Sequence, residues 1–120
     1  MSTSEQTRQV LEHHMTAVDS GDIDAILSDY GDDAVLLTSK GARRGHGQIR
    51  QVLEWLLANV FMPGSSFSML QQLVEGEIAY IVWSAESQRY RVPLATDTYL
   101  IRDGKIVTQT FAAKLEPKSA

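Results

Sequence analysis

The chain has 120 residues, the length of one domain, and its 43% hydrophobic and 22% charged residues are typical of a globular protein. It contains no cysteine, which excludes disulfides, thiol nucleophiles and cysteine-bound metals. A formal net charge of −4, with no basic cluster larger than Arg43-Arg44, argues against nucleic-acid binding. No apolar run approaches the roughly 18 residues needed to cross a membrane, and the N-terminus does not resemble a secretory signal. We therefore expect one cytoplasmic domain over residues 1–120.

The first segment has the apolar periodicity of a helix. Apolar residues recur at helical spacing from Val10 to Val18, and Ser20-Gly21 ends the run. His14 lies on the same apolar face. A histidine in this position is either a core residue with a satisfied hydrogen bond or a catalytic group facing a cavity.

A second and a third helix follow. Asp22 can cap a short helix whose apolar face continues to Tyr30, so Tyr30 is expected to face inward. A short strand over 34–38 and a turn lead to a helix over about 47–60 with an unbroken apolar stripe. Trp55 lies on the flank of that stripe, where it lines a cavity mouth or covers the surface. The basic residues before and within this helix form either an anion site or a solvated cap, and we favour the cap.

The second half of the chain has the periodicity of strands. Four strands are expected, over 66–74, 78–87, 91–101 and 105–113. Helices followed by antiparallel strands indicate the α+β class, with helices stacked on one face of a curved sheet. Both faces of the second strand are apolar, which leaves the direction of Trp83 open. The polar tail 116–120 is expected to fray.

The turn at Asp103-Gly104 decides what surrounds Asp97, because strands disfavour Asp and the residue needs an explanation. A two-residue turn would place Asp97 opposite Thr110. A three-residue turn that includes Arg102 would place it opposite Gln109. We favour the three-residue turn because it sorts the side chains into two consistent faces. Four threonines then share one face, and Asp97 shares the other with Tyr99, Gln109 and Phe111.

Several stretches together resemble the nuclear transport factor 2-like superfamily, and in particular its ketosteroid isomerase and SnoaL-like polyketide cyclase branch. They are Asp19 to Ile26, Tyr30 to Val35, Arg44-Gly45 followed by Ile49-Arg50, and Asp97 to Ile106. The resemblance implies a cone-shaped, cystatin-like α+β barrel in which three helices and a curved antiparallel sheet enclose one apolar cavity. It also implies a homodimer through the outer face of the sheet.

The resemblance assigns roles to individual residues. Asp97 falls on the oxyanion-binding acid of ketosteroid isomerase, which an apolar setting keeps protonated; that enzyme is the established precedent for such an acid. His14 takes the place of the oxyanion-binding tyrosine. Thr38 stands where the general base should be, which argues against authentic ketosteroid isomerisation. SnoaL-like cyclases use an Asp and His pair, which Asp97 and His14 could supply.

Three functions are consistent with these residues. The first is a cofactor-independent isomerase, cyclase or hydratase that acts on a small apolar carbonyl compound and uses Asp97 and His14 as catalytic residues. The second is a binding protein for a small apolar ligand, and the third is a dimerisation module without a ligand. We expect no metal, no organic cofactor, and no nucleic-acid or membrane partner. The expected ligand-binding residues are Tyr30, Thr38, Trp55, Tyr99, Gln109 and Phe111.

Overall fold

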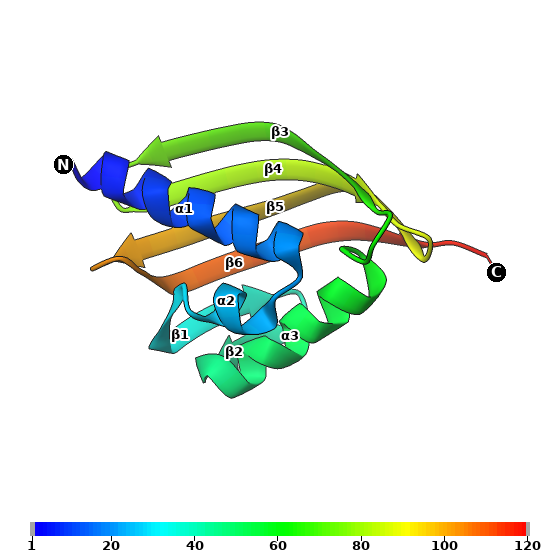
Figure 1. The fold of residues 1–120 in the computed structure, drawn as a ribbon, viewed down its shortest axis with the longest axis horizontal. Coiled ribbons are helices and arrows are strands. Elements are labelled where there is room, and N and C mark those ends of the chain that lie inside the picture. Colours follow the sequence, from blue (N-terminus) through cyan, green and yellow to red (C-terminus); the bar gives the residue numbers. More distant parts are fainter. Residues whose placement is uncertain (1, 120) are drawn as a thin grey trace.

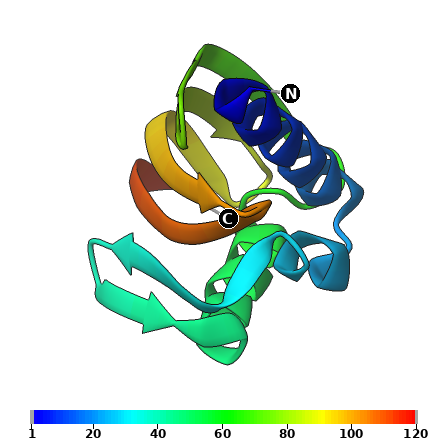
Figure 2. The same cartoon turned by 90° about the vertical axis from the view of Figure 1, so that its left-hand side faces the viewer.

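The computed structural model describes residues 2–119, in which helices pack on the concave side of a curved, open sheet (Figures 1 and 2). The elements are, in chain order, α1 (Thr3–Ser20), α2 (Ile23–Leu27), β1 (Tyr30–Thr38), β2 (Gly41–Arg44), α3 (Gly45–Asn59), β3 (Ser66–Glu75), β4 (Ile78–Glu86), β5 (Tyr90–Arg102) and β6 (Lys105–Pro117). The α+β class and the cone-shaped arrangement expected from the sequence are confirmed. Within residues 2–119, no helix is long and apolar enough to span a membrane.

Local signals set the limits of α1 and the face that it buries. The side chain of Ser2 accepts a hydrogen bond from the backbone N–H of Glu5, and Gly21 ends the helix in the left-handed conformation with φ of 72°. Leu11 and His14 are among its buried residues, three positions apart on one face. Helical spacing therefore places a histidine against the sheet.

Helix α2 is shorter than its apolar pattern suggests. Asp22 caps it as expected, accepting from the N–H groups of Asp24 and Ala25. The helix ends at Leu27, however, and Tyr30 begins β1 instead of ending α2. The chain enters the sheet at this point because the N–H of Ile106 in β6 donates to the carbonyl of residue 29 over 2.8 Å. Tyr30 is buried, as the sequence predicted.

The sheet is not a purely antiparallel meander. Its strand order is β2-β1-β6-β5-β4-β3, and β1 runs parallel to β6. Strand β2, over residues that we expected to form only a turn, pairs with β1 as a hairpin. The parallel pairing is possible because α3 and four strands separate β1 from β6 in sequence.

The three-residue turn predicted between β5 and β6 is wrong, but the prediction of which side chains share each face of the sheet is right. The turn has two residues, Asp103 and Gly104, both with positive φ, and Arg102 pairs with Lys105. Beyond Ile101 the register shifts because Val107 forms a bulge without a partner. The shift restores the expected alternation. Asp97 therefore pairs with Phe111, Tyr99 with Gln109 and Thr98 with Thr110.

Two further expectations about the surface can now be assessed. Strand β6 extends to Pro117, which pairs with Tyr90, so residues 116 and 117 of the expected frayed tail are ordered in the sheet, whereas residue 120 lies outside the described residues. The basic residues around the start of α3 point to separate partners. Arg50 pairs with Asp24 over 2.7 Å, and a ring nitrogen of His46 lies 2.9 Å from the carbonyl oxygen of Tyr30. These side chains are engaged by protein groups and do not converge on one anion site.

Candidate functional site

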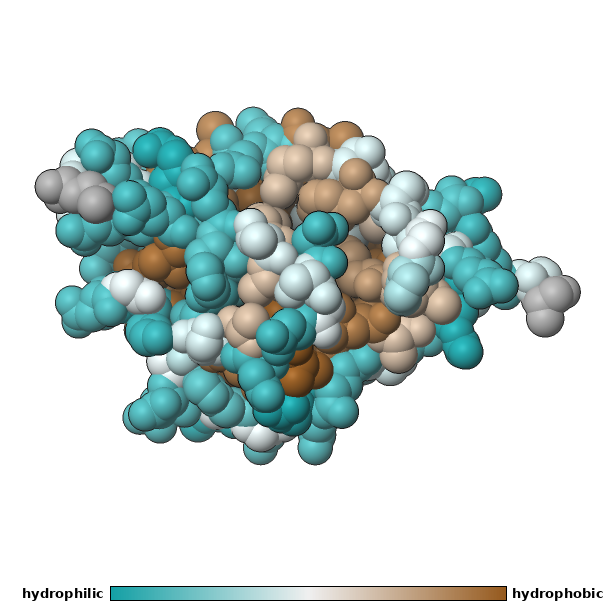
Figure 3. Space-filling model, viewed as in Figure 1, coloured by the Kyte–Doolittle hydropathy of each residue, from teal (hydrophilic) through white to brown (hydrophobic). Residues whose placement is uncertain are grey.

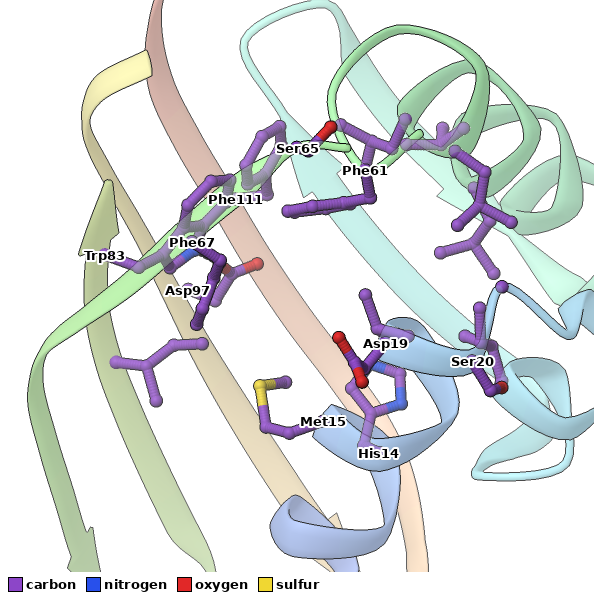
Figure 4. Close-up of a pocket in the computed structure, with 18 of the residues that line it drawn as sticks. His14, Met15, Asp19, Ser20, Phe61, Ser65, Phe67, Trp83, Asp97 and Phe111 are labelled. Atoms are coloured by element: carbon purple, nitrogen blue, oxygen red, sulfur yellow. Dashed lines mark hydrogen bonds between the residues drawn. The ribbon is translucent and has the colours of Figure 1, made fainter. Parts of the chain in front are cut away.

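A cavity of about 440 Å³ lies between the helices and the concave face of the sheet. The C-terminal half of α1, one side of α3 and the segment 61–65 form one wall, and the inner faces of β4, β5 and β6 form the other (Figure 4). Figure 3 shows apolar side chains gathered between the end of α1 and α3, with hydrophilic side chains around them. A cavity of this size is large enough for a small organic molecule.

Asp97 is a buried polar group of the cavity wall that hydrogen bonds hold at both oxygens. It is only 4% exposed, and both of its carboxylate oxygens accept hydrogen bonds. The indole N–H of Trp83 donates to Oδ2 over 2.7 Å, and the side-chain amide of Gln109 donates to Oδ1 over 2.8 Å. The hydroxyl of Tyr30 in turn donates to the amide oxygen of Gln109. The neighbouring strands therefore fix Asp97 in one orientation.

The environment of Asp97 raises its pKa to about 6. Burial is the main cause, because it disfavours the charged form. The hydrogen bonds from Trp83 and Gln109 oppose it, and the charge of His14 opposes it less. We expected burial to outweigh His14, and this is confirmed.

The hydrogen bonds also change the role that the resemblance gave to Asp97. A protonated oxyanion-binding acid must donate from its carboxyl group, but here both oxygens of Asp97 accept. With a pKa of about 6, the group is mostly ionised at pH 7. Each oxygen has a further lone pair for a ligand. Two accepted hydrogen bonds and an ionised carboxylate at pH 7 together suit a proton acceptor better than an oxyanion donor.

His14 lines the cavity from the α1 side, while Asp97 lies on the sheet side next to Trp83 (Figure 4). The imidazole packs edge-on against two aromatic rings, with centroid distances of 5.4 Å to Tyr30 and 5.5 Å to Tyr99. Its Nδ1 lies 3.1 Å from Oδ2 of Asp29, a buried carboxylate that does not line the cavity. His14 and Asp97 thus border the same space without forming the direct pair that would have competed with burial.

The two tyrosines of the site are suited to donate hydrogen bonds. Burial raises the pKa of Tyr30 and of Tyr99 well above the usual range, and the negative charge of Asp97 adds to the effect. Both phenols therefore remain protonated. The hydroxyl of Tyr99 has no hydrogen-bond partner within residues 2–119, so it is free to bind a ligand.

The structure places four of the six expected ligand-binding residues on the cavity wall, namely Tyr30, Tyr99, Gln109 and Phe111. The other two expectations are wrong. Thr38 lies at the β1–β2 turn, where its hydroxyl bonds backbone groups, and Leu36 is the residue of this strand that reaches the cavity. Trp55 is 40% exposed and packs on Tyr90 at the surface.

Sequence reasoning missed two partners in the site. Trp83 was left without a direction because both faces of its strand are apolar, so no alternation marked it. Asp29 was not considered, since a polar residue after a short helix is typical of a loop.

The carboxylates of the cavity wall are not balanced by lysine or arginine within residues 2–119. Its acidic residues are Asp19 and Asp97, and no lysine or arginine lines it within residues 2–119. In the same part of the chain, no group of three or more His, Asp or Glu side chains is arranged to hold a metal ion. The cavity is therefore an apolar space with carboxylate, imidazole, phenol and amide groups.

The fold, with helices on the concave side of a curved sheet, is shared with solved structures of nuclear transport factor 2-like proteins. The sequence profile of the SnoaL-like domain matches residues 11–109, so the chain belongs to the SnoaL-like domain family. No significant sequence match to a curated protein was found.

Solved structures share the fold at low sequence identity. A nuclear transport factor 2-like protein of unknown function from Mesorhizobium loti is 20% identical, with a TM-score of 0.77 and coverage of 95% of both chains. A SnoaL-like protein of unknown function from Burkholderia thailandensis is 20% identical, with a TM-score of 0.72 and coverage of 92% of this chain and 95% of the other. An LEH-like epoxide hydrolase from Mycobacterium tuberculosis is 16% identical, with a TM-score of 0.71 and coverage of 92% of this chain and 84% of the other.

Proposed function

We propose that this protein is an acid–base enzyme of the isomerase, cyclase or hydratase type, which acts on a small, neutral, carbonyl-containing molecule without a cofactor. The observation that carries the proposal is Asp97, a buried carboxylate with a pKa of about 6 inside an apolar cavity. A general base works best when its pKa lies near the operating pH. An ordinary Asp would be a weaker base by about two pKa units.

The residues around the cavity have complementary roles in this chemistry. Asp97 would take a proton from the carbon next to the carbonyl and become neutral, while the electron pair moves to the carbonyl oxygen. The hydroxyl of Tyr99 and His14 in its protonated, imidazolium form would bind that oxygen from the adjoining wall. Return of the proton from Asp97 to another carbon gives isomerisation, and attack by the enolate on a second carbonyl, whose oxygen takes that proton, gives cyclisation. In hydration Asp97 would instead take a proton from water, whose oxygen adds to a C=C bond conjugated with the carbonyl, and the proton would then pass to the α-carbon.

The wall chemistry limits the substrate. Two carboxylates and no cation line the cavity within residues 2–119, so phosphates and carboxylic acids would meet repulsion. The aromatic rings of Phe61, Phe67 and Phe111 surround Trp83, with centroids 5.3 to 6.3 Å from it. These rings provide an apolar, aromatic wall beside Asp97. A neutral ketone with an unsaturated or aromatic ring fits both features.

The proposal can be tested by following the exchange of α-protons for deuterium in a panel of small cyclic ketones. The wild-type protein should catalyse exchange, and Asp97→Asn should lower the rate at least about 100-fold because the base is lost. Thr38→Asp is the matched control, since it adds a carboxylate outside the cavity and should leave the rate unchanged. Equal rates for the wild type and Asp97→Asn would refute the role of Asp97.

One observation favours a second function, that of a binding protein without turnover. Tyr30, Gln109, Asp97 and Trp83 already satisfy one another by hydrogen bonds, as a purely structural network would. Such a protein would bind apolar ketones with measurable affinity and would not exchange their protons. Calorimetry and the exchange assay on the same panel therefore separate the two functions, since binding without exchange indicates the binding protein and binding with exchange the enzyme.

We also propose that the protein is a homodimer through the outer face of the sheet. A row of uncharged side chains crosses five strands at directly paired positions, namely Leu73, Tyr80, Thr98, Thr110 and Leu37. Next to it, Ile78 and Leu94 are about half exposed. An uncharged row of this kind suits a two-fold contact. Light scattering at micromolar concentration should give twice the chain mass of 13.3 kDa, and Thr98→Glu should give the monomer mass.

A further inference from the structure

One buried carboxylate outside the cavity holds two histidines of different exposure. Asp29 follows α2, and its side chain is 9% exposed. Its Oδ2 lies 3.1 Å from Nδ1 of His14, whose side chain is 3% exposed, and its Oδ1 lies 2.7 Å from Nδ1 of His13, whose side chain is 60% exposed. The adjacent residues of α1 thus reach the same carboxylate, one from the cavity side and one from solvent.

The hydrogens in this cluster follow from its geometry. A carboxylate can only accept hydrogen bonds, and both of its oxygens face an Nδ1 atom. Each ring must therefore carry its hydrogen on Nδ1. Since Asp29 does not line the cavity and His14 does, Nε2 of His14 is the ring nitrogen that remains for a ligand.

We infer that Asp29 is the positioning residue of His14, so that His14 gives and takes protons only at Nε2, on the cavity side. Asp29 keeps the hydrogen on Nδ1 in both protonation states and stabilises the imidazolium when it forms, the role of the carboxylate in a catalytic triad. His13 covers the other oxygen of Asp29 against solvent. The catalytic consequence rests on the proposed function, but the position of the hydrogen does not.

The remaining neighbours of His14 do not offer another partner for its Nδ1. Tyr30 of β1 and Tyr99 of β5 meet the imidazole with their rings, at interplanar angles of 79° and 72°. The hydroxyl of Tyr30 is used by Gln109. The charge of Asp97 acts on His14 from the sheet side without a hydrogen bond within residues 2–119. Asp29 is therefore the group that orients the ring.

The tautomer of His14 can be read directly from ¹⁵N NMR of the three histidine rings at pH about 8.5, where an ordinary histidine is neutral. We expect the hydrogen of His14 on Nδ1, opposite to the tautomer that free imidazole side chains prefer in water. His46 is an internal reference, because its Nε2 lies 2.9 Å from a carbonyl oxygen and must carry the hydrogen. A hydrogen on Nε2 of His14 in the wild type would overturn the inference, whatever the variants do.

Two variants test the cause. Asp29→Ala should move the hydrogen of His14 to Nε2, whereas His13→Gln, which keeps a donor toward Asp29, should leave it on Nδ1. An unchanged tautomer in a folded Asp29→Ala protein would contradict the role of Asp29. With a ketone that the wild type exchanges, Asp29→Ala should lower the rate about 100-fold. If the proposed function is wrong, the protein will show no exchange rate to lower, but the hydrogen of His14 will still lie on Nδ1 in the wild type and on Nε2 in Asp29→Ala.

Discussion

Asp97 on β5 and Asp29 after α2 are both buried carboxylates, and each accepts two hydrogen bonds. They differ in the groups that donate. Asp97 is held by an indole and an amide, which stay neutral and leave it in contact with the cavity. Asp29 is held by two imidazoles, which can themselves carry charge, and it lies outside the cavity wall.

This difference separates two uses of a buried acid. Neutral donors offset only part of the desolvation of a carboxylate, so the pKa of Asp97 rises and the group can take a proton from a ligand. Imidazole donors link the carboxylate to a second titratable group, so Asp29 can orient His14 and does not need to touch a ligand itself. Burial alone would not have distinguished the two residues. The identity of the donors does.

The largest effect expected from this comparison is on stability. Asp97 has a raised pKa in the folded protein, so the folded state binds its proton more tightly than the unfolded chain does. Its burial costs nothing below about pH 3, where the group is protonated in both states, and the cost grows as the pH rises to about 6 and then levels off. The free energy of unfolding of the wild type, relative to Asp97→Asn, should fall by roughly 3 kcal/mol between about pH 3 and 7.

Urea unfolding of both proteins across this range measures the difference, in which the titration of all other groups cancels. A constant difference would mean that Asp97 titrates alike in the folded and unfolded chains. That result would contradict the claim that burial raises the pKa of Asp97 above that of an exposed Asp.

The second effect concerns the indole donor. Trp83→Phe keeps an aromatic ring but removes the N–H, and it should lower the free energy of unfolding at pH 7 by about 1–3 kcal/mol. The same change should raise the pKa of Asp97 further, because the hydrogen bond from Trp83 lowers it. Trp55→Phe is the matched control at an exposed tryptophan and should change stability by less than about 0.5 kcal/mol. Equal losses of stability in the two variants would contradict a specific contribution of the Trp83 indole N–H.

These expectations show what the sequence could and could not predict. The inward face of Asp97 was predictable because strand alternation with Tyr99, Gln109 and Phe111 fixes the face whenever the register changes by an even number of residues. The predicted turn was nevertheless wrong, because a bulge at Val107 has no sequence signal in this strand.

The partners of the two carboxylates were harder to predict. The indole of Trp83 reaches Asp97 across paired strands, and the sequence pattern of β4, apolar on both faces, does not reveal which residues turn inward. Asp29 meets His13 and His14 only because the chain bends from α2 into β1 beneath α1. Such contacts depend on tertiary packing, which local periodicity does not encode.

The smallest effect lies further along the network. Tyr30→Phe removes the hydroxyl that donates to Gln109 and should lower the free energy of unfolding by about 1 kcal/mol. Gln109 would then be less firmly oriented toward Asp97. Tyr90→Phe is the control, since the hydroxyl of Tyr90 makes no hydrogen bond within residues 2–119 and its ring packs on Trp55. Thermal unfolding of the two variants side by side gives the comparison, and a loss as large for Tyr90→Phe would exclude a specific role of the hydroxyl.

The central claim is that Asp97 is a proton acceptor poised near neutral pH. The most direct test is ¹³C NMR of its side-chain carboxyl group as a function of pH in the folded protein, with Asp97→Asn to assign the signal. The account predicts a midpoint at about 6. A midpoint near 4, the value of an exposed Asp, would contradict it.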